Sequence, residues 1–151
     1  MGTRKWRWIA LAAACYAVTP ASGTANWASP TYGITIPTHV NSIGQSCSGS
    51  VVMTLTHDAP CTMTVAPTGA GQEVLTNSGD SLTTAYKFTG ATLQNPDATW
   101  VDSTTFLTHS YNILGTGPSD TITLAVQGTS PADHAVASGN YSASLVVTVT
   151  W

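Results

Sequence analysis

The chain has 151 residues, of which 42% are hydrophobic and only 7% are charged. This length is sufficient for one domain and too short for two of ordinary size. Four basic residues against seven acidic ones leave no basic surface for phosphate groups, which argues against nucleic acid and anionic lipid as partners.

The first 25 residues have the three parts of a secretory signal peptide. The basic stretch MGTRKWRW precedes the apolar stretch IALAAACYAV, which is too short to span a bilayer. Small residues up to Ala25 then predict cleavage before Asn26. The alternative is lipidation at Cys15, because the letters AAAC weakly resemble a bacterial lipoprotein signal.

Removal of this segment makes the chain more acidic. Three of the four basic residues leave with it, so Lys87 alone stands against seven acids, and one minus seven gives a net charge of −6. Threonine, serine and glycine then solvate most of the surface. Such a composition is typical of an extracellular β-protein or of a subunit in an assembly.

Two cysteines remain after cleavage, Cys47 and Cys61. A pair of cysteines in an exported protein is most simply explained by a disulfide. A disulfide closing a loop of this length would stabilise the fold by roughly 3 kcal/mol. The spacing does not favour a redox or metal-binding pair, which is usually closer.

Short runs of alternating apolar residues follow one another between turn residues, which predicts an all-β fold. The run TYGITIPTHV (31–40) comes first and SVVMTLT (50–56) second. CTMTV (61–65), LTTAYKFTG (82–90) and TFLTHSYNIL (105–114) follow, the last with an expected bulge between Phe106 and Tyr111. TITLAVQG (121–128) and the terminal run complete about seven strands, as in an immunoglobulin-like β-sandwich.

The terminal stretch GNYSASLVVTVTW has the most regular alternation in the chain. One face is expected to lie in the core, because a row of exposed apolar side chains would promote aggregation. That face consists of Tyr141, Ala143, Leu145, Val147, Val149 and Trp151.

The sequence predicts no catalytic centre, no metal site and no cofactor. It lacks the nucleophile elbow, the phosphate-binding loop and the zinc motif. In "HD" at 57–58 and "DH" at 133–134 the neighbouring side chains are expected to face water. Met53 and Met63 have the parity of core residues, which favours packing over copper binding.

The terminal stretch resembles the ending of spore coat protein U domain proteins and archaic chaperone–usher pilus subunits. The matching positions are Gly139, Tyr141, Leu145, Val147, Val149 and Trp151. The segments AYKFTGATL and PCTMTVAPTGAG are similar to internal segments of that family.

This resemblance implies an incomplete immunoglobulin-like sandwich that lacks its last strand. A periplasmic chaperone and an outer-membrane usher would be partners, and the N-terminal extension of a neighbouring copy would fill the groove beside the terminal strand. Residues 1–25 would then be the signal peptide, 26–37 the extension and 38–151 the pilin domain. The protein would reach the cell surface through the periplasm as a subunit of a pilus or coat.

The candidate donor strand carries Tyr32, Ile34 and Ile36 on one face. These residues could equally belong to the first strand of the chain's own sheet. A second hypothesis for function is a self-complete secreted sandwich that binds a glycan, with Trp27, Trp100 and Tyr111 as stacking platforms.

Overall fold

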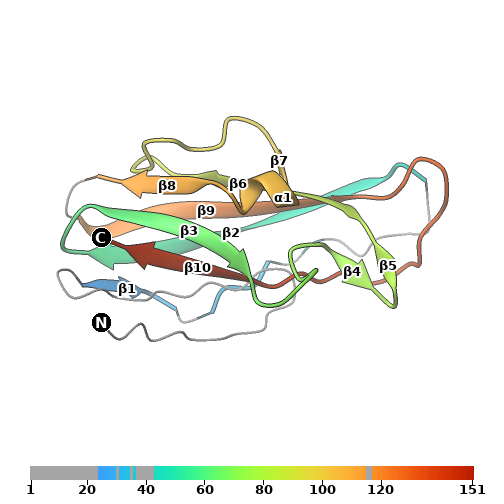
Figure 1. Ribbon diagram of the computed structural model, residues 1–151, viewed down its shortest axis with the longest axis horizontal. Helices are drawn as coiled ribbons and strands as arrows, with labels where there is room; N and C mark the ends of the chain where they lie inside the picture. The colour runs from blue at the N-terminus through green and yellow to red at the C-terminus, as the bar shows by residue number, and fades with distance from the viewer. Residues whose placement is uncertain (1–23, 30, 35, 37–42, 115–116) are drawn as a thin grey trace.

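The computed structural model describes residues 24–29, 31–34, 36, 43–114 and 117–151; its regular structure is antiparallel β-sheet with a single short helix among the described residues (Figure 1). The larger sheet has the strand order β1-β2-β9-β6-β7. Its strands are β1 (Ala25–Trp27), β2 (Ser46–His57), β9 (Gly117–Thr129), β6 (Thr83–Thr89) and β7 (Val101–Asp102). The predicted all-β fold is therefore confirmed.

A second sheet has the order β10-β3-β8 and faces the first across a common core. It consists of β10 (Leu145–Thr150), β3 (Cys61–Pro67) and β8 (Ser110–Ile113). A small hairpin of β4 (Thr76–Asn77) and β5 (Asp80–Ser81) forms a separate two-stranded sheet, joined by a bridge between Thr76 and Ser142 to the segment before β10. Its loop residues Ser78 and Gly79 have φ angles of 52° and 96°, as a two-residue turn matching the twist of a hairpin requires.

The central pair of the larger sheet, β2 and β9, shows why these residues form strands. The register runs from Ser46 opposite Thr129 to Leu55 opposite Asp120, with an irregularity before His57. Along β2, Met53 and Leu55 are fully buried, while Thr54 between them is partly exposed on the opposite face of the sheet. The alternation read from the sequence therefore matches the two faces of the sheet.

Four aromatic rings join the two sheets at one end of the core. Phe88 of β6 packs edge-on against Tyr111 of β8 with ring centroids 5.0 Å apart. Phe106 stacks on Tyr86 at 5.0 Å and contacts Phe88 at 5.4 Å. Each such pair contributes about 0.5–1.5 kcal/mol beyond the burial of its surface.

The expected bulge between Phe106 and Tyr111 is wrong, because a short helix, α1 (Ser103–Phe106), ends at Phe106 and a turn leads from it to the strand that holds Tyr111. The Asp102 carboxylate caps it by accepting a 2.9 Å hydrogen bond from the Thr105 N–H. The Thr105 side chain and, secondarily, this backbone hydrogen bond lower the pKa of Asp102. The helix turns Phe106 into the core and shifts the phase of the alternation before Tyr111.

The N-terminal run predicted as a strand over residues 31–40 differs from the structure. Residues 31–34 and 36 form no strand, and residues 35 and 37–40 lie outside the described part of the chain. The strand that does form near this end is β1, which lies earlier in the sequence. No helix in the described ranges is long and apolar enough to cross a membrane.

Candidate assembly site

The terminal strand β10 is an outer strand of its sheet. It pairs with β3 along its whole length, from Leu145 opposite Pro67 to Thr150 opposite Thr62. In the part of the chain that the structure describes, no other strand pairs with its second edge. Figure 1 shows β10 and β1, the outer strands of their sheets, on the same side of the view. An unpaired edge of this kind can accept a further strand.

The inner face of this terminal stretch is buried, as the sequence predicts. Leu145, Val147 and Val149 have no exposed surface, and Tyr141 is 2% exposed. Trp151 is half-buried and packs against the same core. The predicted core face is therefore confirmed, while its role as the edge of a groove stays a prediction.

Tyr141 fixes the chain where it enters β10. Its hydroxyl donates a 2.8 Å hydrogen bond to the Ala137 carbonyl oxygen. Burial raises the pKa of Tyr141, with a smaller contribution from the negative charge of Asp80. The tyrosine thus stays neutral and anchors the approach to the strand.

The N-terminal segment lies against the chain's own sheets in this structure. Trp27 of β1 pairs with Leu55 of β2, and the Tyr32 hydroxyl bonds to the backbone of Thr54. Ile34 is 2% exposed and belongs to the core. Of the candidate donor residues, Tyr32 and Ile36 are partly buried against that core.

An additional clamp holds the start of this segment. The Asp58 carboxylate accepts hydrogen bonds of 2.6 and 2.7 Å from the backbone N–H and the hydroxyl of Thr24. These bonds lower the pKa of Asp58. Thr24 and Ala25 would leave with the predicted signal peptide, so this clamp belongs to the uncleaved chain.

The predicted disulfide between Cys47 and Cys61 is wrong for this structure, in which both thiols are free. Cys47 lies near the start of β2, and Cys61 begins β3 just after the hairpin at the far end of β2. The ten residues from Cys47 to His57 span about 33 Å along the strand. A disulfide requires Cα atoms within about 7 Å of each other, so the extended strand keeps the two cysteines apart.

A histidine and an aspartate form an ion pair beside Cys61. Nε2 of His57 contacts Oδ2 of Asp120, and Nδ1 of His57 lies 2.7 Å from the Ala59 carbonyl oxygen. The His57 side chain is fully buried, so the expectation that it faces water is wrong. The irregularity in the pairing of β2 with β9 occurs at this point and accompanies the inward turn of the imidazole.

The Cys61 thiol is poorly suited to act as a nucleophile despite this neighbouring pair. Burial, and secondarily the charge of Asp120, raises its pKa to about 11. A thiol attacks as the thiolate, which is scarce at neutral pH when the pKa is this high. The residues His57, Asp120 and Cys61 are therefore better explained as packing and support for the hairpin.

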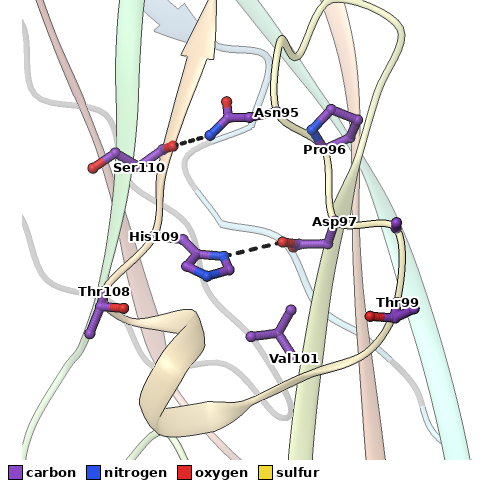
Figure 2. A pocket seen from close by; sticks show the side chains of 9 residues that line it. Asn95, Pro96, Asp97, Thr99, Val101, Thr108, His109 and Ser110 are labelled. Carbon is purple, nitrogen blue, oxygen red and sulfur yellow. Dashed lines mark hydrogen bonds and ion pairs between the residues drawn. The ribbon is translucent and has the colours of Figure 1, made fainter.

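A second histidine–aspartate pair borders a surface pocket of about 590 Å³ between residues 95–101 and 108–110 (Figure 2). Nδ1 of His109 lies 3.2 Å from Oδ1 of Asp97. Asn95 donates a 2.5 Å bond to the Ser110 carbonyl oxygen and accepts one from the Asn112 N–H. These bonds are internal to the loop and β8, so they serve to hold the loop.

Sequence reasoning missed the buried positions of Asp97 and Asp120, which are 7% and 6% exposed. Asp97 lies in a stretch, QNPDAT, whose composition predicts a solvated turn. Its partners Phe88 and Tyr111 come from two different strands. Only their meeting in space could reveal the aspartate's role.

The structure also places the residues considered for a metal site and for glycan stacking. No group of three or more histidine, cysteine, aspartate or glutamate side chains within the described ranges could hold a metal ion. Met53 and Met63 are fully buried, as their core parity predicts. Trp27 and Tyr111 are also buried, so neither can serve as a stacking platform for a sugar, while Trp100 is 39% exposed.

Comparisons with known proteins add no assignment, because no family model and no curated protein matches the chain.

Proposed function

We propose that this protein is a structural subunit of a surface pilus or coat that polymerises by accepting a strand from a neighbouring copy. The observation that carries the proposal is the unpaired edge of β10 next to its fully buried residues Leu145, Val147 and Val149. Pairing with a donated strand would satisfy the exposed backbone groups of this edge. In this proposal the protein catalyses no reaction. Its role is assembly, and adhesion would be a second role of the assembled fibre or coat.

The strand order supports an incomplete immunoglobulin-like sandwich. In that fold the strands A, B, E and D form one sheet and C, F and G the other. The order β1-β2-β9-β6 corresponds to A-B-E-D, and the pair β3 and β10 corresponds to C and F. The described strands contain none at the position of G, which would lie beside β10.

Two buried indole groups on the same side offer further support. Nε1 of Trp27 in β1 and Nε1 of Trp151 after β10 are buried, and no group among the described residues accepts a hydrogen bond from either. Buried polar groups are usually paired, and a donor without an acceptor costs about 1–3 kcal/mol. Backbone carbonyl groups of an added strand could supply the missing acceptors.

The segment 26–37 is the proposed donor, with Tyr32, Ile34 and Ile36 as the residues that enter the neighbour's groove. In the structure Ile34 is buried in the chain's own core, so the segment must leave that position before it can be donated. Exchange of identical contacts between copies is a low-cost route to assembly. A periplasmic chaperone and an outer-membrane usher would control the exchange after export.

The test is a chain in which residues 26–37 are repeated after Trp151 through a flexible linker. The added copy should fill the edge of β10, raise the melting temperature and stop polymerisation, because the groove is occupied within one molecule. The matched control carries serine in place of both isoleucines of the added copy and should gain little stability. Equal melting temperatures for the parent and the extended chain would refute an open groove.

A further inference from the structure

The outer face of the larger sheet differs from the rest of the surface in charge. The strand register shows which residues of β2, β9 and β6 lie next to one another on this face. We call this surface the neutral face. It consists of Ser46, Ser48, Ser50, Val52, Thr54, Thr121, Thr123, Ala125, Gln127, Thr129, Thr83, Ala85, Lys87 and Thr89.

Hydroxyl groups and small side chains dominate the neutral face. Ser46 and Thr129 lie opposite each other and join their hydroxyl oxygens at 2.8 Å. Val52, flanked by Thr123, is 58% exposed and is one of the few large apolar residues on the surface. A hydroxyl group both donates and accepts hydrogen bonds, so such a face is complementary to itself.

The charges of the neutral face balance. Lys87 is the only cation within it, and Asp102 of β7 lies at its margin, opposite Ala85. The other acids of the exported chain lie elsewhere. Asp58, Glu73, Asp80, Asp97 and Asp133 are in turns, loops or the small hairpin, and Asp120 is buried.

We propose that the neutral face is a lateral docking surface for a second copy of this chain. After removal of the predicted signal peptide, residues 1–25, the chain would carry a net charge of −6 and repel its own copies over most of its surface, and this repulsion is weakest where the charge is zero. A two-fold arrangement can also place Lys87 of one copy near Asp102 of the other. A strongly charged partner finds no complementary charge here.

An exposed tryptophan lies at the same margin. Trp100 directly precedes β7, and alternation along the chain places it on the side of Asp102. It is 39% exposed, and Lys87 donates a 3.0 Å hydrogen bond to the carbonyl oxygen of Ala98, two residues before it in the chain. Tryptophan is among the residues that most often anchor protein interfaces.

Lateral docking goes beyond the proposed function, because it uses a different surface. Strand donation would link subunits end to end through β10, whereas the neutral face would join neighbouring subunits side by side. Hydroxyl groups and small side chains bury little apolar surface, so each contact is expected to be weak. Repetition along two fibres would add the contacts together and strengthen lateral binding.

The experiment measures the sedimentation of the exported protein over a range of concentrations, for the parent chain and for Val52→Glu. The glutamate places a charge at the centre of the face and should weaken self-association at least tenfold. Ser81→Glu, on the small hairpin, is the matched control and should leave association unchanged. Melting temperatures near that of the parent would show that both variants are folded.

Other outcomes decide against the proposal. If parent and Val52→Glu chains are equally monomeric, or if both glutamate variants weaken association equally, the neutral face is not the docking surface. If the parent stays monomeric but binds an insoluble polysaccharide that Val52→Glu no longer binds, the partner is a glycan. Strand donation does not use Val52, so Val52→Glu should leave it unchanged. If the Val52→Glu chain loses end-to-end polymers and keeps its lateral association, the substitution acts on the edge of β10 and not on the neutral face.

Discussion

The hydroxyl of Tyr111 donates a 2.8 Å hydrogen bond to Oδ2 of Asp97, and this bond joins the two sheets. The same carboxylate oxygen accepts a 2.7 Å bond from the N–H of Phe88 in β6, while Tyr111 belongs to β8. The Asp97 N–H returns a 2.9 Å bond to the Phe88 carbonyl oxygen. One buried aspartate thus ties the loop after β6 to a strand of each sheet.

Removal of the tyrosine hydroxyl should therefore destabilise the fold. We expect Tyr111→Phe to lower the free energy of unfolding by about 1–3 kcal/mol, because a buried carboxylate loses one of its donors. Unfolding in urea measures the change. Tyr86→Phe is the control, since its hydroxyl donates to a neutral acceptor, the Glu73 carbonyl oxygen, and its loss should cost about 0.5–1.5 kcal/mol. A cost for Tyr111→Phe no larger than that of the control would contradict the role assigned to Asp97.

The sequence predicted those parts of the fold that depend on local alternation. The strands around Met53, Phe88 and Leu124 follow from period-two patterns, and the structure places all three side chains in the core. The positions of Asp97 and Asp120 could not be predicted in this way. Their burial depends on partners that lie 9 to 63 residues away in the sequence.

The disulfide prediction failed because the separation of two cysteines in the sequence does not determine their distance in the fold. The separation of Cys47 and Cys61 in sequence is compatible with a disulfide, but one extended strand and one hairpin turn place them at opposite ends of β2. A candidate for strand donation, in contrast, could be found from the sequence because its signal is local. The unpaired edge of β10 is visible only once the strand order is known.

The two thiols should differ in reactivity. Cys47 is partly exposed and Cys61 is buried, and burial raises the pKa of both. We expect a thiol reagent at pH 8 to label Cys47 in the folded protein and to label Cys61 only after addition of denaturant. Mass spectrometry of proteolytic fragments would assign the label. A native protein whose mass shows the two thiols joined would contradict the strand arrangement.

The stability of the fold should fall at alkaline pH. Burial raises the pKa of Cys61 from 9.0 to about 11 and raises the pKa values of Tyr86 and Tyr111 above the usual value of 10. The unfolded chain therefore loses these protons first, which favours unfolding. The stabilising contribution is complete below about pH 9 and is lost as the pH rises through 11.

Urea unfolding at pH 7, 9, 10 and 11 would measure this dependence. Cys61→Ala should remove part of the slope between pH 9 and 11, and Tyr111→Phe should remove part of the slope above pH 10. A free energy of unfolding that stays constant up to pH 11 would mean that these groups ionise as easily in the folded chain as in the unfolded one.

Ile34 offers a test of where the N-terminal segment lies before assembly. The side chain is 2% exposed in the core of its own chain, so Ile34→Ala should lower the free energy of unfolding of the isolated subunit by about 2–5 kcal/mol. Thr31→Ala, in the same segment and only partly buried, should change it by less than about 0.5 kcal/mol. If Ile34→Ala leaves the isolated subunit unchanged but weakens the polymer, the segment acts only as a donor and does not pack on its own sheets. A loss of stability in both states would mean that the same isoleucine fills a site in its own chain first and in the neighbour afterwards, as exchange between copies requires.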